Sequence, residues 1–334
     1  MDTLSKYYDD LDDDGQFEVV HHPRTNKPKL DPKAVQQFIQ RQDDARQTFA
    51  FTYRPARFEE GWLLDSLGSF FEQRWIADIL CKIKAGKEAS VYLCRAGEQV
   101  KSGLVAAKVF RPRMLRNLKN DQLYRQGRVD LDENGHPIDD PGMLKAKHKR
   151  SVYGEQIRHQ SWIAYEYQTL RCLHTAGADV PQPYEMSENA ILMSYIGDEA
   201  GAAPTLNTVT LEAGEVRRLY ERILHNVELM LANCIVHGDL SAYNVLYWEG
   251  QVTLIDFPQV ISPSSHRSAY PFFSRDITRI CEYFARQGLH SDPARLAAGL
   301  WKAHGFRRNP EVHPGMLDGD DPADRQLWKR SREE

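Results

Sequence analysis

The sequence predicts a two-lobed α+β fold, with a small β-rich lobe followed by a mainly helical lobe. Runs typical of β-strands gather within residues 90–110, whereas the longest helical pattern lies in the second half, over 216–231. Strands and helices do not alternate regularly, which argues against a doubly wound parallel sheet. No internal repeat is evident.

The composition is that of an ordinary folded protein. With 334 residues, 41% hydrophobic and 27% charged, the chain has room for about two domain-sized units. No run reaches the roughly 20 apolar residues of a membrane-spanning helix, and the first residues lack the features of a signal peptide, so we expect a cytoplasmic protein. A net charge of −4 argues against a uniformly basic nucleic-acid-binding protein. Five widely spaced cysteines indicate reduced core residues and no zinc site.

Changes in composition divide the chain into five segments. Residues 1–28 are rich in aspartate and poor in apolar side chains, so we expect a mobile acidic arm. Residues 29–79 include a helix start at Asp31-Pro32 and are expected to form a helical extension that docks on the main body. The remaining segments are the β-rich lobe over 80–197, the helical lobe over 198–308 and a polar tail over 309–334.

The β-rich lobe begins with two strand signals. Residues 90–94 and 104–110 are β-rich and bracket the turn-forming segment 97–103, which predicts neighbouring antiparallel strands. Residues 111–160 then have the character of a long mobile insert.

The rest of this lobe contains one helix and one strand. Helical spacing runs from Trp162 to His174, and Gly177 is the predicted stop. Residues 191–196 are typical of a buried strand.

The helical lobe opens with a long amphipathic helix. Its apolar stripe runs from Val216 to Leu231, with Thr210 as the expected cap. Two short strands, 244–247 and 251–255, follow and are joined across Glu249-Gly250. Further helices are expected near 274–286 and 292–304.

Three side chains that carry a carbonyl group flank these two short strands. Asp239 and Asn244 stand five residues apart just before the first strand, and Asp256 follows the second. A tight hairpin of this size would bring all three to one edge. Carboxylates and amides so placed hold magnesium and align an acceptor hydroxyl in phosphoryl transfer, and the spacing equals that of the protein-kinase catalytic loop.

A lysine in an apolar strand completes this pattern. Lys108 has apolar neighbours on both sides, which favours a buried ion pair with the downstream Glu166 over a lysine that reaches solvent. Taken alone, Glu166 would be a solvated helix residue. His237 is expected to form a structural hydrogen bond to the backbone, and we assign it no chemistry.

Two segments of the helical lobe carry a family resemblance. His237-Gly238-Asp239-Leu240-Ser241-Ala242-Tyr243-Asn244 and Ile255-Asp256-Phe257-Pro258-Gln259 resemble the RIO-type atypical protein kinases. Upstream, Ala85-Gly86-Lys87-Glu88-Ala89-Ser90-Val91-Tyr92 is similar to the nucleotide loop of that family, Ala107-Lys108-Val109 to its lysine strand, and Trp162 with Glu166 to its regulatory helix. The resemblance covers roughly residues 80–285.

The resemblance implies a protein-kinase-like fold without an activation segment and a Mg²⁺-dependent transfer from ATP to a protein hydroxyl, including autophosphorylation. Mn²⁺ could replace Mg²⁺. Asp239 would be the catalytic base, and Asn244 and Asp256 would bind the metal. Asp256 would also accept the phosphoryl group itself if the protein acts as an ATPase through an aspartyl phosphate. The nucleotide-binding residues would be Gly86, Lys87, Glu88, Ala89, Ser90, Val91, Lys108, Glu166, Met193, Ser194, Tyr195 and Ile196.

Departures from ordinary protein kinases leave the acceptor open. The loop has a single Gly86, Ser241 stands where many kinases carry lysine, and no Ala-Pro-Glu segment follows Asp256. The RIO family shares these departures. Without an activation segment the usual platform for a peptide is absent, and the sequence does not identify the protein substrate.

Two alternative functions remain. A small-molecule kinase of the aminoglycoside or choline type would share the His-Gly-Asp-Leu opening, although Ser241-Ala242-Tyr243 and Phe257-Pro258-Gln259 favour the RIO type. A nucleotide-gated scaffold in ribosome assembly would bind ATP and turn it over slowly. The basic residues of the insert suggest a contact with RNA or the ribosome, but no aromatic residues interleave them, which favours a solvated loop. They are Lys145, Lys147, His148, Lys149 and Arg150.

Overall fold

The structure is a computed structural model in which residues 49–111, 131–132, 136, 138, 152–266 and 268–307 are described. All of these residues belong to one unit, Arg41–Glu334. Several predictions lie outside the described residues: the acidic arm, the helix start at Asp31-Pro32, the basic run of the insert and the polar tail over 309–334.

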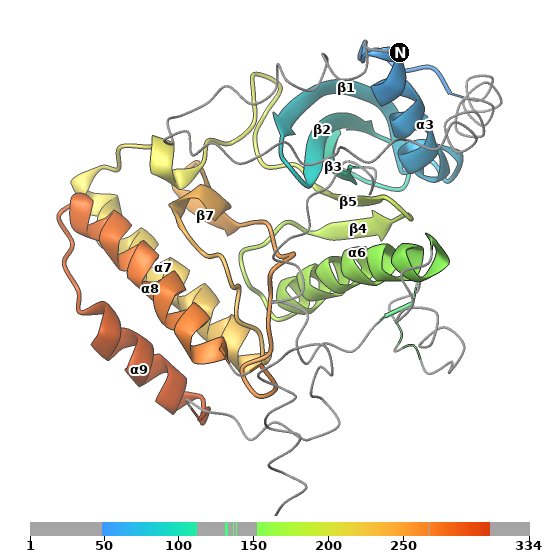
Figure 1. Cartoon of the computed structure of the whole chain (residues 1–334). Helices are drawn as coiled ribbons and strands as arrows, with labels where there is room; N and C mark the ends of the chain where they lie inside the picture. Colours follow the sequence, from blue (N-terminus) through green and yellow to red (C-terminus); the bar gives the residue numbers. More distant parts are fainter. Residues whose placement is uncertain are drawn as a thin grey trace, which may run out of the picture. The chain divides into compact units, whose positions relative to one another are not determined.

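The β-rich lobe is built on one antiparallel sheet with the strand order β1-β2-β3-β5-β4 (Figure 1). The predicted strands at 90–94, 104–110 and 191–196 are confirmed as β2, β3 and β5, whereas β1 and β4 were not predicted. The strands are β1 Ile76–Ala85, β2 Ala89–Ala96, β3 Leu104–Phe110, β4 Pro183–Met186 and β5 Ala190–Ser194.

One face of this sheet is covered by helix α3 (Arg57–Glu72), which lies in the expected N-terminal extension. Leu63, Leu67 and Phe70 are fully buried and share a hydrophobic cluster with side chains of β1, β2, β3 and β5. Trp62 adds a hydrogen bond from Nε1 to the carbonyl oxygen of Phe110 at 2.9 Å. The helix is therefore fixed to the sheet by apolar burial, the dominant favourable contribution in such packing.

The opposite face of the sheet belongs to a second, larger hydrophobic cluster that includes α6 (Val152–Thr175). This helix begins inside the segment 111–160 that was expected to be an insert, so that boundary was wrong by about two helical turns. Ile157 shows why the helix extends this far, because its side chain is buried. Gly177, the predicted stop, has a φ of +79° and lies two residues after the helix end at Thr175.

The described part of the helical lobe contains a short hairpin and three α-helices. Its strands, β6 (Val245–Trp248) and β7 (Gln251–Leu254), match the predicted pair. The expected cap Thr210 was wrong, because the N-cap of the first helix is Glu212. Asp292 caps the last helix by accepting a hydrogen bond from the amide of Arg295 at 3.0 Å. The helices are α7 Ala213–Ala232, α8 Ala269–Arg286 and α9 Pro293–Ala303.

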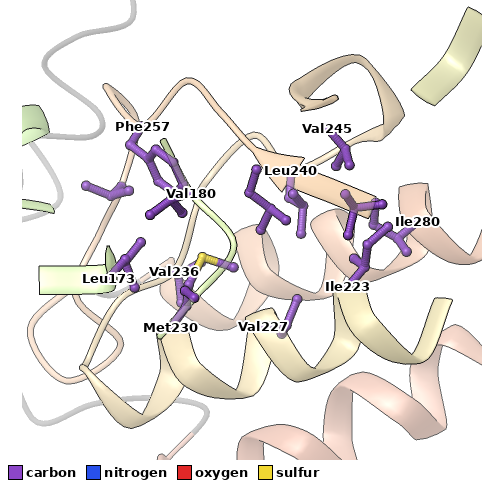
Figure 2. Packing of buried hydrophobic residues seen from close by; sticks show 14 of the residues in the cluster. Leu173, Val180, Ile223, Val227, Met230, Val236, Leu240, Val245, Phe257 and Ile280 are labelled. Atoms are coloured by element: carbon purple, nitrogen blue, oxygen red, sulfur yellow. The ribbon is translucent and has the colours of Figure 1, made fainter. Parts of the chain in front are cut away.

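The core of this lobe reaches the predicted catalytic segment. Leu240 is buried among side chains from α7, α8 and the segment after β7, including Val227, Ile280 and Phe257 (Figure 2). Because Leu240 follows Asp239 directly, burial of this one side chain anchors the neighbouring carboxylate to the lobe.

Two expectations from composition can be compared with the described residues. All five cysteines are free, but only Cys94 and Cys281 are buried, so the expectation of core residues was wrong for Cys81, Cys172 and Cys234. Within the described ranges, no helix combines the length and the apolar character needed to span a membrane.

Candidate active site

Lys108 lies between two carboxylates. Its Nζ is 2.5 Å from Oε1 of Glu166 on α6 and 2.7 Å from Oδ1 of Asp256, which follows β7. The ion pair predicted between Lys108 and Glu166 is confirmed, whereas contact of Lys108 with Asp256 was not predicted. The Lys108–Asp256 contact joins the sheet to the helical lobe.

Burial and mutual charge shape the protonation of this triad. Burial acts to lower the pKa of Lys108, but the charges of Asp256 and Glu166 outweigh it and raise that pKa, so the ammonium stays charged. Burial raises the pKa of Glu166, with Asp256 adding to the effect and Lys108 opposing it. Among the described residues, Oε2 of Glu166 is buried without a hydrogen-bond partner, which adds a cost to its ionised form, while Lys108 at 2.5 Å stabilises that form.

Asp256 combines an unusual backbone with an exposed carboxylate. Its φ is +70°, a left-handed conformation that non-glycine residues adopt rarely and that often occurs at functional sites. Its side chain is 47% exposed, while that of Glu166 is 2% exposed. Burial of the group would raise the pKa of Asp256, but Lys108 draws it below its ordinary value. Asp256 is therefore the ionised, accessible carboxylate of the triad.

The segment 237–244 is held by its backbone. Gly238 has a φ of +81°, and a Cβ there would lie 2.2 Å from the carbonyl oxygen of Gln259, so only glycine fits. The amide of Gly238 donates to Oδ2 of Asp276 at 2.9 Å, and a guanidinium nitrogen of Arg275 donates to the Gly238 carbonyl oxygen. Both partners come from α8.

His237 has the structural role that was predicted. Its Nδ1 accepts a hydrogen bond from the amide of Asp239 at 3.3 Å, and its Nε2 lies 3.2 Å from the carbonyl oxygen of Ile255. These contacts fit a neutral ring with the proton on Nε2. Burial lowers the pKa of His237, which favours the same neutral form.

Asp239 and Asn244 lie together, as their spacing predicts. Asn244 donates from Nδ2 to the carbonyl oxygen of Asp239 at 2.9 Å and approaches Oδ2 of the same residue at 3.4 Å. Sequence reasoning missed Arg279 of α8, whose Nη1 donates to Oδ1 of Asp239 at 2.6 Å. The only sequence signal was helical spacing, since Arg275 and Arg279 are four residues apart and share one helix face.

The residues fit a magnesium ion by the chemistry of their donor atoms. Asn244 uses Nδ2 for its hydrogen bonds, which leaves the carbonyl oxygen Oδ1 as a possible ligand. The amide of Ile255 bonds to the carbonyl oxygen of Asn244 at 3.0 Å and so brings Asp256 near it. The described residues contain no group of three or more His, Cys, Asp or Glu able to hold a metal. Mg²⁺ does not need such a group, because it commonly takes one or two protein oxygens together with phosphate and water.

The predicted nucleotide loop turns between β1 and β2. The amide of Gly86 bonds to the carbonyl oxygen of Ala89 at 2.9 Å, and a Cβ on Gly86 would lie 2.8 Å from that oxygen. Ser90 and Val91 continue into β2, where Val91 stands opposite Lys108. Lys87 is exposed in the turn, and the carbonyl oxygen of Glu88 accepts from the amide of Arg111 at 2.8 Å.

The last four of the predicted nucleotide-binding residues lie where β5 ends. Met193 and Ser194 pair with β3, and Tyr195 and Ile196 follow them. The carbonyl oxygen of Ile196 already accepts from the amide of Ala203 at 2.9 Å. A contact of this segment with the nucleotide stays a prediction.

The family model and the similar proteins point to the same family. Residues 99–296 match the family model of the RIO domain. The chain is 35% identical over 135 residues to a RIO-type serine/threonine-protein kinase Rio1 of Thermoplasma acidophilum, which covers 40% of this chain and 69% of that protein. It is 32% identical over 228 residues to a serine/threonine-protein kinase RIO1 of Chaetomium thermophilum, which covers 64% of this chain and 40% of that protein.

A solved structure agrees with the fold. The Rio2 kinase of Chaetomium thermophilum, in a complex described as ADP/Mg²⁺-phosphoaspartate, matches with a TM-score of 0.51 at 18% identity. The alignment covers 90% of this chain and 84% of that one. At this identity the likeness shows the fold alone, and it agrees with the predicted two-lobed α+β arrangement.

Proposed function

Because this chain belongs to the RIO domain family of serine/threonine kinases, we propose that it transfers the terminal phosphoryl group of ATP to a protein hydroxyl and to itself. The observation that carries this proposal is Lys108 held at 2.5 Å and 2.7 Å between Glu166 and Asp256. A buried cation beside an accessible carboxylate suits a phosphate that arrives with a metal ion.

Each side chain of the site has a role in this reaction. Lys108 binds the α- and β-phosphates, and Glu166 orients its ammonium. Asn244 and Asp256 would hold Mg²⁺, with Mn²⁺ as a substitute. Bound there, the ion neutralises developing charge on the phosphates. Asp239 aligns the acceptor hydroxyl and takes its proton, while Asn244 and Arg279 fix its carboxylate.

A second function, ATP hydrolysis through Asp256, is favoured by the ionised and half-exposed state of that carboxylate. A carboxylate oxygen would attack the γ-phosphorus, the bond to the bridging oxygen would break, and ADP would leave with the electron pair. Water would later hydrolyse the acyl phosphate. A single-turnover reaction of the wild type should then give an acid-stable, hydroxylamine-sensitive phosphoenzyme, and Asp256→Asn should give none. If the wild type forms no such phosphoenzyme, hydrolysis through Asp256 is refuted.

Parallel assays of ATP hydrolysis and autophosphorylation test the main proposal. Asp239→Asn should lower autophosphorylation by about a hundredfold or more, a loss typical of removing a general base. Glu228→Gln, on the exposed side of α7, serves as the matched control and should behave like the wild type. Equal autophosphorylation in wild type and Asp239→Asn would contradict the role of Asp239.

The alternatives predict different results. A small-molecule kinase would phosphorylate aminoglycosides or choline, and a screen of these compounds should give no product. A nucleotide-gated scaffold would bind ATP with negligible phosphate transfer even in the wild type. The cytoplasmic location remains a prediction. An RNA or ribosome contact through the basic run also remains a prediction, since that run lies outside the described residues.

A further inference from the structure

Two lysines of β1 stand on opposite faces of the sheet. Lys82 pairs with Tyr92 and Lys84 pairs with Val91, and the register of β1 against β2 shifts between these two pairs. In a regular strand, residues two apart share one face, so the shift turns Lys84 away from the side of Lys82. Tyr92 belongs to the cluster beneath α3, whereas Val91 packs against the larger cluster on the other face.

The contacts of the two lysines follow this division. Lys82 is partly buried and its Nζ lies 2.6 Å from Oε1 of Glu59 on α3. Lys84 is exposed and has no ion pair with any residue in the described part of the chain. The charge of Lys82 is thus paired with Glu59, while the charge of Lys84 is available for a ligand.

Lys84 also shares its face with Lys108. Val91 stands opposite Lys84 on one side and opposite Lys108 on the other, so the three residues form one row across β1, β2 and β3. Directly opposite residues of antiparallel strands project to the same face, and two strand spacings separate the outer two by about 10 Å. Both lysines therefore project toward the candidate active site.

The strand register places the Lys84 charge near the phosphoryl-transfer residues, because Lys84 and Lys108 lie in one row across the sheet. Lys108 is already paired with both Glu166 and Asp256, so its single positive charge is shared between these two groups. A triphosphate entering there benefits from a second cation.

We infer that Lys84 is a phosphate-binding residue of the nucleotide site, with its ammonium on the terminal phosphate of a nucleoside triphosphate. Lys108 holds the inner phosphates from β3, and Lys84 reaches the outer one from β1, on the side of Asp256. The inference rests on the proposed ATP-dependent function and adds the residue that distinguishes a triphosphate from a diphosphate.

Nucleotide affinities measured by calorimetry with Mg²⁺ test this role. Lys84→Met should weaken ATP binding about tenfold, the size expected for one charge-assisted contact, with a smaller loss for ADP and none for adenosine. Lys84→Arg should keep most of the ATP affinity. Lys101→Met removes the same charge from the exposed turn between β2 and β3 and should match the wild type. Because Lys84 is exposed, its variants should keep the wild-type melting temperature.

Different outcomes separate this inference from the function on which it rests. An unchanged ATP affinity in Lys84→Met would overturn it while leaving nucleotide binding intact. An equal loss for ATP and ADP, or any matching loss for adenosine, would refute the assignment to the terminal phosphate. A wild-type protein that binds no ATP would instead refute the proposed function itself.

Discussion

Arg279 of α8 donates a hydrogen bond from Nη1 to Oδ1 of Asp239 at 2.6 Å. The same helix holds the neighbouring backbone, since Asp276 accepts from the Gly238 amide and Arg275 donates to the Gly238 carbonyl oxygen. One helix face therefore fixes both the main chain and the reactive side chain of the proposed catalytic loop.

Replacing Arg279 by leucine should release the carboxylate of Asp239 from its aligned position. We expect kcat for autophosphorylation to fall about tenfold or more, because misalignment of a catalytic group is costly, while the KM for ATP stays unchanged. Arg286→Gln, at the exposed end of α8, should leave both constants at wild-type values. A raised KM with normal kcat in Arg279→Leu would contradict a positioning role.

Two substitutions of Glu166 should distinguish its effect on activity from its effect on the free energy of unfolding. Glutamine at this position keeps an oxygen that accepts from Lys108 and removes an ionisation that burial disfavours, so the free energy of unfolding should change by less than about 1 kcal/mol. Autophosphorylation should nevertheless fall, because Lys108 loses an ionic partner. Glu166→Ala, which also leaves a cavity, should lose about 3 kcal/mol in urea unfolding. Full activity in Glu166→Gln would contradict the proposed orientation of Lys108.

Gly238→Ala should damage both stability and activity. Its Cβ would meet the carbonyl oxygen of Gln259 at 2.2 Å, and its φ of +81° is unfavourable for alanine, so we expect a loss of about 3 kcal/mol. Gly299→Ala in α9 is the matched control, because nothing lies within 4 Å of that added methyl group. It should gain up to about 1 kcal/mol from helix propensity. Similar melting temperatures for the two variants would falsify the steric argument.

The titration of Asp276 should make the free energy of unfolding depend on pH. Burial raises the pKa of Asp276 to about 7, partly offset by Arg275 and by the amides of Leu240 and Gly238, from an ordinary value of 3.8. A carboxyl whose folded pKa is raised stabilises the folded state fully below its unfolded pKa, and that stability is lost as pH rises through the folded value.

Urea unfolding from pH 4 to pH 7 should therefore show a loss of stability in the wild type relative to Asp276→Asn. The slope difference should approach about 1.4 kcal/mol per pH unit at most, the value for one proton. Asparagine does not titrate and retains an oxygen for the Gly238 amide. Parallel pH profiles for the two proteins would show that Asp276 does not titrate in this window.

Local sequence patterns predicted the parts of the fold that depend on local signals. β2 and β3 have uninterrupted β-rich runs, and the loop residues Asp239 and Asn244 carry their geometry in their spacing. β1 was missed because three register shifts break its alternation, so its burial pattern has no period of two.

Local sequence patterns could not predict contacts between residues that are far apart in the chain. Arg279 meets Asp239 only because α8 packs beside the loop, and Asp256 reaches Lys108 only through the arrangement of the sheet and the helical lobe. The first turns of α6 were assigned to the insert because their sequence has little apolar periodicity, and burial of Ile157 stabilises them in the folded protein.

The two partners of Lys108 also determine when the site can form. Glu166 is 58 residues away along the chain, and Asp256 is 148 residues away. Contacts between such distant residues form late, because closing a long loop loses entropy before any contact compensates for it. During synthesis from the N-terminus, the sheet and α6 emerge first, and Lys108 then has only one of its two carboxylates. The nascent chain therefore gains a complete site only after the segment beyond β7 has left the ribosome and folded back onto β3.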